Sequence, residues 1–286
     1  MARKFLPALS AIMLTAAAVL AGSIAAWAQE PTIPNFWDEK ERMAKPDLSQ
    51  VARVRFLTTI DFPPFNYIDA SGRLAGFHVE LARAICAELG IVARCQIQGL
   101  PWEELEEAIE RGDGEALITG TAITAENREK YAFTRPYLGF PARFVAQKAA
   151  DDFREPMNAA VVGKKIGVLS GSSHEAMLRA YFPGAVVTAI EESEQLYEAL
   201  RERKVDGAFG DGMRMSFWLQ GSESRDCCRF VGGPYIAPEF LGYGMAIATR
   251  LDNRELAEAF DYALREIGVK GKFAELYLKY FPVSFY

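Results

Sequence analysis

The chain has 286 residues, of which 50% are hydrophobic and 24% are charged, and its formal net charge is −6. This apolar content is typical of a packed globular protein and excludes an intrinsically disordered chain. The length allows one large or two medium-sized domains. The acidic balance argues against a nucleic-acid-binding protein, which needs a basic surface to replace the counterions of the phosphates.

The N-terminus has the features of a secretory signal, which we expect to span residues 1–28. Arg3 and Lys4 precede a long apolar run, and Ala26-Trp27-Ala28 ends it with small residues on either side of a larger one. This pattern predicts cleavage after Ala28 and a mature protein in the periplasm. A membrane anchor is the alternative, but the most apolar stretch, residues 11–21, is shorter than the ~20 residues that span a bilayer. Cleavage removes two cations, so the net charge becomes −8.

All four cysteines lie in the exported part of the chain, where disulfides can form. Cys86 and Cys95 are expected on a helix and on the strand that follows it, so a bridge between them is geometrically reasonable. For the adjacent Cys227 and Cys228, a bond and two free thiols both remain open. A metal site with four thiolates would need the two pairs to converge without C-x-x-C spacing, so we expect no metal.

Residues 29–50 contain three prolines and no sustained period, which predicts an N-terminal extension on the surface. Strands and helices alternate after it. The first unit is predicted to have strands at 54–59, 91–97 and 116–119, with helices at 77–89 and 101–112 between them.

A second unit repeats this order, with strands at 165–169, 185–190 and 205–210 and helices at 172–181, 194–203 and from Gly212 onward. Two extended apolar runs, 140–147 and 242–249, cross between the units. Helices at 253–267 and 272–281 follow, and Asp252 with Glu255 predicts a capping box at the first of them.

Two such units predict an α/β protein with two lobes, in which two parallel-rich sheets with flanking helices are joined by a double hinge. Residues 51–143 together with 240–286 would form lobe 1, and residues 144–239 would form lobe 2. Ligands of open α/β sheets bind beyond the carboxyl ends of the strands, so the cleft between the lobes is the expected site.

Polar and aromatic side chains stand near these predicted strand ends: Phe62, Trp102, Thr119, Gly120, Arg128, Ser172, Ser173 and Asp211. Together they offer ring faces, a cation, N–H donors and an anion, which is what a zwitterionic amino acid needs. Each residue type also has a purely structural explanation. Ser172 and Asp211 could be helix caps, the two aromatic residues could belong to the core, and Arg128 could be a surface charge.

Six ordered sequence blocks carry a resemblance to a known family: Phe62-Pro63-Pro64-Phe65, 76–82, 123–126 with 133–137, 164–168, 205–211, and 270–273 before Tyr280-Phe281. Over residues 52–282 the chain resembles the periplasmic solute-binding proteins of polar amino-acid ABC transporters, family 3. The resemblance implies a bilobal type II fold that closes on an amino-acid-like ligand and docks on an inner-membrane ABC permease. We further expect a monomer that uses no cofactor.

The resemblance assigns roles to several of these residues. Phe62 and Trp102 correspond to the aromatic pair that sandwiches the ligand side chain, and Asp211 corresponds to the acid that holds the α-amino group. Thr119 and Gly120 fall where the family uses hydroxyl and backbone groups. A cysteine pair that bridges the first helix to the next strand also occurs in some members, which supports a bond between Cys86 and Cys95.

The carboxylate side of the site departs from the family pattern. Ser172 and Ser173 fall where the second lobe donates to the carboxylate. The arginine that binds this group in the family belongs at position 127, but this chain has Asn127 followed by Arg128. A shift of one residue turns a helical side chain by about 100°. Either the backbone adjusts so that Arg128 reaches the cleft, or the ligand lacks an ordinary α-carboxylate contact.

Two further departures concern the kind of ligand. Ala122 stands where many relatives have a Ser or Thr hydroxyl, and Thr59 occupies a position that is often Asp in binders of cationic side chains. The resemblance therefore favours an apolar, aromatic or otherwise uncharged amino-acid-like ligand over Lys, Arg or His.

Other functions on the same fold remain open. Some relatives are lyases of the cyclohexadienyl dehydratase type, which need an acid or base in the cleft. His174 is the one imidazole that could serve, although a polar surface residue is the simpler interpretation, and His78 is assigned no chemistry. Other relatives are accessory proteins of periplasmic quinoprotein dehydrogenases, and the extension and the Cys227-Cys228 pair mark this chain as an unusual member.

Overall fold

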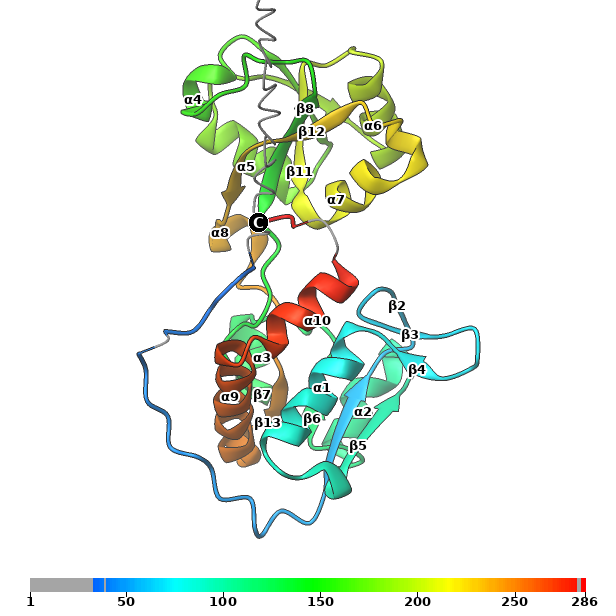
Figure 1. Ribbon diagram of the computed structural model, residues 1–286, viewed down its shortest axis with the longest axis vertical. Coiled ribbons are helices and arrows are strands. Elements are labelled where there is room, and N and C mark those ends of the chain that lie inside the picture. The colour runs from blue at the N-terminus through cyan, green and yellow to red at the C-terminus, as the bar shows by residue number, and fades with distance from the viewer. Residues whose placement is uncertain (1–32, 39, 282–283) are drawn as a thin grey trace, which may run out of the picture. The chain divides into compact units, whose positions relative to one another are not determined.

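The structure is a computed structural model that describes residues 33–38, 40–281 and 284–286 (Figure 1). The expected signal sequence therefore lies outside the described residues. Within these ranges, no helix has both the length and the apolar character needed to cross a membrane.

The first sheet has the strand order β5-β1-β6-β13-β7. Strand β1 (Val54–Thr58) pairs in parallel with β5 (Cys95–Gly99) and β6 (Ala116–Leu117). Strand β13 (Ala248–Arg250) runs antiparallel between β6 and β7 (Tyr131–Phe133). A strand from late in the chain thus completes a sheet that is built mainly from early residues.

The residues of β1 alternate between the two faces of this sheet because successive side chains of a strand point in opposite directions. Phe56 packs in the core with α1 (Phe77–Glu88), α9 (Arg254–Val269) and α10 (Lys272–Tyr280). Leu57 packs on the other face with α2 (Leu105–Glu110). Figure 1 shows α1, α9 and α10 lying together, and contacts join all three pairs.

A small sheet of three strands, which the sequence did not predict, follows β1. It contains β2 (Asp61–Phe62), β3 (Asn66–Ile68) and β4 (Leu74–Ala75). The chain turns from β2 to β3 at a cis Pro63-Pro64 bond. Gly76 then leads into α1 with φ 125°, and a Cβ at this position would lie 2.2 Å from the carbonyl oxygen of Phe65. Only glycine allows this close approach between two backbone segments.

The second sheet has the strand order β10-β9-β11-β8-β12. Strands β9 (Lys165–Leu169), β10 (Val186–Ile190) and β11 (Gly207–Asp211) are parallel. Strand β8 (Ala142–Gln147) is antiparallel to β11 and to β12 (Cys228–Tyr235). The connecting helices are α5 (Ser173–Tyr181), α6 (Ser193–Arg201) and α7 (Gly212–Gln220). This is the strand and helix order that the sequence predicted, and the fold is the expected two-lobed α/β fold.

Several elements were not expected, and all of them except β12 have at most six residues, which is close to the minimum length at which periodicity can be read. They are α3 (Ala125–Lys130), α4 (Met157–Ala160), α8 (Pro238–Leu241) and the strands β7 and β12. Four 3₁₀ turns complete the described elements: Val92–Arg94, Trp102–Glu104, Ser222–Ser224 and Leu251–Asn253.

Two of these 3₁₀ turns correct sequence predictions. The strand expected at 91–97 begins only at Cys95, because Val92–Arg94 form a turn first. The capping box at Asp252 is wrong for a similar reason. The turn Leu251–Asn253 delays the start of α9 to Arg254, so Asn253 takes the cap position and Asp252 pairs with Arg250 instead.

The segments that link the two sheets run next to each other. The backbone N–H of Met245 donates to the carbonyl of Leu138 over 2.6 Å, and the N–H of Tyr137 donates to the carbonyl of Met245 over 2.8 Å. The first link leads into β8 and the second into β13. Met245 lies within the predicted crossing 242–249, whereas Tyr137 and Leu138 precede the predicted crossing 140–147, most of which is strand β8 itself.

Both cysteine pairs are disulfide-bonded. The Cys86–Cys95 bond joins α1 to the start of β5, so it ties a helix to the strand that follows it. The Cys227–Cys228 bond lies between neighbours at the beginning of β12. The described residues contain no free cysteine.

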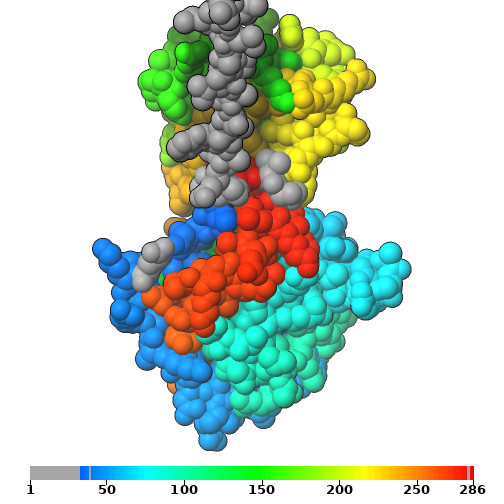
Figure 2. Space-filling model, viewed as in Figure 1, coloured from blue at the N-terminus to red at the C-terminus, as the bar shows by residue number. Residues whose placement is uncertain are grey.

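The described part of the N-terminal extension is anchored on the first lobe rather than merely lying over it. Trp37 is only 6% exposed and meets Phe273 edge-on, with 6.1 Å between ring centroids. The guanidinium of Arg135 donates to Glu41 over 2.6 Å, and that of Arg94 donates to the carbonyl of Leu48 over 3.1 Å. Figure 2 shows the blue atoms of this segment alongside the orange atoms of α9. The extension therefore contributes to the core.

A fully buried chain of polar side chains supports the start of α1. The Asn66 amide donates to Thr59 and its oxygen lies 2.7 Å from Nδ1 of His78, while Nε2 of His78 lies 2.8 Å from the Tyr137 hydroxyl. The Asn66 oxygen can only accept, so Nδ1 carries the proton and Nε2 accepts from Tyr137. Burial lowers the pKa of His78 to about 3, so the imidazole is neutral in the folded protein.

We expect Trp37→Ala to destabilise the protein by about 3 kcal/mol, because it removes a large buried side chain from the core. Urea unfolding followed by circular dichroism would measure this loss. Trp102→Ala is the matched control, because Trp102 is 55% exposed and its removal leaves no cavity. Equal midpoints for the two variants would show that the extension does not stabilise the lobe.

We expect His78 to make stability depend on pH between about 6.5 and 3. In this window the unfolded chain binds a proton at His78 and the folded protein does not, so stability falls as the pH falls, by about 1.4 kcal/mol per unit. His78→Gln lacks this contribution, so the stability advantage of the unmodified protein over the variant should shrink below pH 6.5. Asp261, whose pKa burial raises to about 6, is present in both proteins and cancels in the comparison. A constant difference between pH 7 and pH 4.5 would contradict the prediction.

Candidate ligand-binding site

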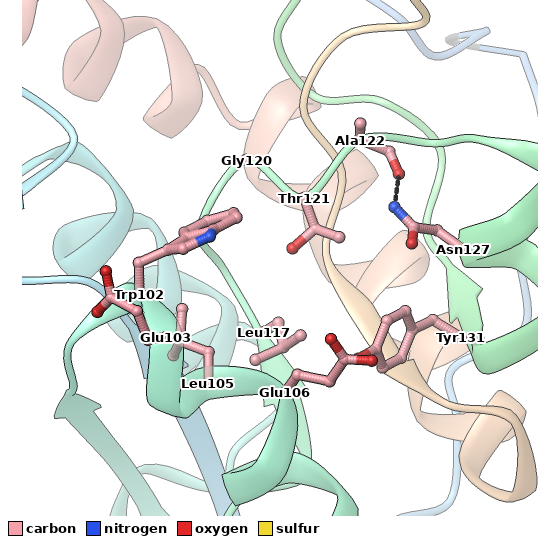
Figure 3. Close-up of a pocket in the computed structure, with 10 residues that line it drawn as sticks. All are labelled: Trp102, Glu103, Leu105, Glu106, Leu117, Gly120, Thr121, Ala122, Asn127 and Tyr131. Carbon is pink, nitrogen blue, oxygen red and sulfur yellow. Dashed lines mark hydrogen bonds between the residues drawn. The ribbon is translucent and has the colours of Figure 1, made fainter.

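A hollow of about 490 Å³ lies in the first lobe, where α2, β6 and the start of α3 come together. Its walls combine aromatic, aliphatic and polar side chains with a stretch of loop backbone (Figure 3). The lining residues are Trp102, Glu103, Leu105, Glu106, Leu117, Gly120, Thr121, Ala122, Asn127 and Tyr131. Trp102 and Gly120 were predicted ligand residues, and Asn127 was the alternative to Arg128.

The loop between β6 and α3 forms one wall of the hollow. Its glycine, Gly120, has φ 86°, and a Cβ there would lie 3.1 Å from the Met245 methyl group and 3.8 Å from the ring of Phe62. Phe62 therefore lies close to the hollow although it does not line it. Both Phe62 and Trp102 are large aromatic residues left exposed, at 39% and 55%. Neither ring is therefore buried in the core, and part of each ring is accessible to a ligand.

Hydroxyl groups fix the geometry of this loop from within. Thr119 is buried, and its Oγ1 lies 2.9 Å from Oγ1 of Thr121. Thr121, which was not among the predicted site residues, lines the hollow, whereas Thr119 does not. Thr119 therefore orients Thr121. The only sequence signal for Thr121 was its place in the loop that follows β6.

Asn127, not Arg128, faces the hollow. The Asn127 side chain donates from Nδ2 to the carbonyl of Ala122 over 2.8 Å, and its backbone N–H donates to the capping hydroxyl of Thr124 over 3.1 Å (Figure 3). Arg128 is exposed and is not among the residues that line the hollow. The local backbone therefore does not bring Arg128 to the position that an arginine at 127 would occupy.

The environments of Thr59, Glu103 and Glu106 could not be read from the sequence pattern. Thr59 is buried and accepts from Asn66, so its identity does not indicate the charge of a ligand. Glu103 and Glu106 belong to a run of acids that, in sequence, resembles an ordinary solvated helix face. Both glutamates lie at the hollow because α2 packs beside β6, and the sequence alone does not reveal this packing.

The predicted residues of the second lobe lie at the carboxyl ends of β9 and β11. Ser172 caps α5: its hydroxyl accepts from the Glu175 N–H over 3.1 Å and donates to the carbonyl of Leu169 over 2.6 Å. Its donor is therefore already used within the protein, in agreement with the structural explanation. Ser173, the first residue of the helix, is exposed.

Asp211 also caps a helix but keeps one oxygen available. Its Oδ1 accepts from the N–H of Arg214 over 3.0 Å at the start of α7. Among the described residues, no hydrogen bond or ion pair engages Oδ2. A carboxylate held in place by one oxygen, with the other open, is well suited to accept from an ammonium group.

His174 is less exposed than the sequence suggested. It follows Ser173 in α5, and its Nε2 is buried without a hydrogen-bond partner in the described part of the chain. Burial lowers its pKa, with a smaller opposing effect of Asp211 and a further lowering by Arg214. These three residues therefore form one polar group at the strand ends of the second sheet. The prediction of a simple surface residue was wrong, because His174 packs near Phe209.

We expect Asn127→Ala to weaken ligand binding about tenfold, because it removes the hydrogen bond that holds the loop and opens one wall of the hollow. Arg128→Ala should change the affinity by less than twofold. Isothermal titration of both variants, with an amino acid that raises the melting temperature of the unmodified protein, would measure this. The opposite ranking would mean that Arg128 reaches the ligand.

Comparisons with known proteins agree with this architecture. The sequence model of the bacterial extracellular solute-binding proteins, family 3, matches residues 54–283. The L-arginine-binding protein of Pseudomonas aeruginosa is 29% identical over 228 residues, which cover 79% of this chain and 86% of the relative.

Two solved structures share the fold. The unliganded, open L-cystine solute receptor of Neisseria gonorrhoeae has a TM-score of 0.69 at 20% identity and covers 82% of this chain and 94% of its own. An ancestral cyclohexadienyl dehydratase has a TM-score of 0.67 at 19% identity and covers 85% of this chain and 99% of its own. Because the family model spans nearly the whole described chain, the protein belongs to the bacterial extracellular solute-binding proteins of family 3.

Proposed function

We propose that the protein is the periplasmic receptor of an ABC importer and binds an amino acid or an amino-acid-like small molecule between its two lobes. Membership of a solute-binding family supports the general function. Residues 51–143 with 240–286 form lobe 1 in this proposal, and residues 144–239 form lobe 2. The partner is an inner-membrane permease, and the receptor acts as a monomer.

The observation that carries the proposal is the exposure of two aromatic rings at a hollow on the strand ends. Large apolar side chains are normally buried, and an exposed pair beside a concave surface marks a binding site. Phe62 and Trp102 fulfil this description. Gly120, with Thr119 behind it, contributes the loop between them.

In the second lobe, Asp211 is the proposed acceptor for a ligand ammonium. The open Oδ2 supports this role. Ser173 offers an exposed hydroxyl at the start of α5, whereas Ser172 positions the helix. Arg128 has no direct role in this version of the site. The arginine-binding relative makes L-arginine a reasonable first compound to test.

A lyase on the same fold is the second candidate, and one observation favours it. The unpartnered, half-buried His174 beside Asp211 is neutral near pH 7 and could act as a base. A receptor instead releases its ligand unchanged. Chromatography of the bound compound after prolonged incubation distinguishes the two, because a dehydratase product has lost a water.

We expect Asp211→Asn to weaken ligand binding by ten- to a hundredfold, because a charge-assisted hydrogen bond contributes about 1.5–3 kcal/mol. Asparagine is also a good helix cap, so the fold should retain its melting temperature. Titration calorimetry with the best compound from a thermal-shift screen of amino acids measures the loss.

Asp226→Asn is the matched control for this change. Asp226 is an exposed acid of the second lobe that pairs with Lys148 away from the strand ends. Its replacement should leave the affinity unchanged. An Asp211→Asn variant that binds as tightly as this control would remove Asp211 from the site.

A further inference from the structure

We propose that the hollow of the first lobe accepts a protonated nitrogen group of the ligand, such as an amine or a guanidinium, and not a carboxylate. This rests on the proposed function, because it names the chemistry of one end of the same ligand. The charges, the free hydrogen-bonding atoms and the rings that line the hollow all support it.

The charged groups on the wall of the hollow are carboxylates. Glu103 and Glu106 line it, and the lining contains no Lys, Arg or His. Outside the lining, Lys130 forms an ion pair with one oxygen of Glu106. Because Lys130 is not a lining residue and is already paired, the wall offers a ligand anion no side-chain cation.

The free amide atom at the hollow is an acceptor. The carbonyl of Ala122 can only accept, so the Asn127 amide must turn its nitrogen toward it. Figure 3 shows the Asn127 oxygen on the other side of this bond, toward the hollow. The Thr121 hydroxyl pairs with that of Thr119, and whichever of the two donates, Thr121 keeps a lone pair that can accept from a ligand. A donor group of the ligand therefore finds a fixed partner here, whereas a carboxylate would face another oxygen.

The remaining walls suit a cation carried on an apolar chain. Figure 3 shows the Trp102 indole on one side and the Tyr131 ring on the other, with Leu105 and Leu117 between them and the Glu106 carboxylate beside Tyr131. Aromatic faces attract organic cations by about 0.5–2 kcal/mol and repel anions. Each of these contributions is modest at a partly exposed site, but all have the same sign.

The test compares two compounds that differ only in the α-carboxylate, L-arginine and its decarboxylated form agmatine. We expect agmatine to bind within tenfold of arginine or more tightly, as measured by isothermal titration calorimetry in one buffer. A carboxylate bound in the hollow, even by backbone N–H groups alone, would make arginine more than tenfold tighter.

The outcomes separate this inference from the proposed function. Arginine binding more than tenfold tighter than agmatine would overturn the inference and leave the receptor function intact. Binding of acidic or uncharged compounds, with neither arginine nor agmatine bound, would also overturn it. No binding of any amino acid or amine would contradict the proposed function as well.

Two side-chain changes test the hollow directly. Glu106→Gln should weaken agmatine binding three- to tenfold, whereas Glu107→Gln, which alters the next acid of α2 outside the hollow, should not. Asn127→Arg should shift the preference at least tenfold toward arginine over agmatine, because it adds a guanidinium to the wall. Equal effects of the two glutamate changes, or an unchanged preference in Asn127→Arg, would overturn the inference.

Discussion

The hydrogen bond from the Asn127 side chain to the carbonyl of Ala122 determines the form of one wall of the candidate ligand site. It closes the loop between β6 and α3 into a fixed turn whose far end is held by the Thr124 cap. The bond also settles which atom of Asn127 remains for a ligand, because a carbonyl partner leaves only one orientation for the amide. The chemistry of the wall is therefore a consequence of the local fold.

The same loop is braced from behind by a segment from much later in the chain. Met245, on the second link between the sheets, lies against Gly120, and its backbone pairs with Leu138 and Tyr137 on the first link. A side chain introduced at Gly120 would therefore crowd Met245 of the second link. The second link therefore packs directly behind the loop that lines the hollow.

The sequence predicted the larger elements because their apolar residues repeat over enough positions to be recognised. Strand β9 and helix α5 were placed to within one residue on this basis. The three-stranded sheet β2-β3-β4 was missed because strands of two or three residues carry no period, and they depend on the turn at Pro63-Pro64 and on the clearance at Gly76. Asp252 was misassigned because a 3₁₀ turn leaves no distinct sequence pattern.

The sequence located candidate residues at the strand ends but not their chemistry, and their binding of a ligand stays a prediction. Strand ends indicated where ligand residues would lie, and Trp102 and Gly120 do line the hollow. What sequence could not reveal was which polar atoms are already used inside the protein, such as the Ser172 hydroxyl, and which remain open, such as one oxygen of Asp211.

The inferred ligand chemistry also agrees with the electrostatics of the whole chain. A net charge of −6 attracts cations and repels anions at distances up to the Debye length, about 8 Å at physiological ionic strength. The acids of the turn Trp102–Glu104 and of α2 extend this field to the hollow, which Glu103 and Glu106 line. An organic cation would thus be guided toward the surface that binds it, whereas a dicarboxylate would meet like charge both on approach and in the hollow. The negative net charge of the chain and the carboxylates at the hollow therefore both favour a cationic ligand.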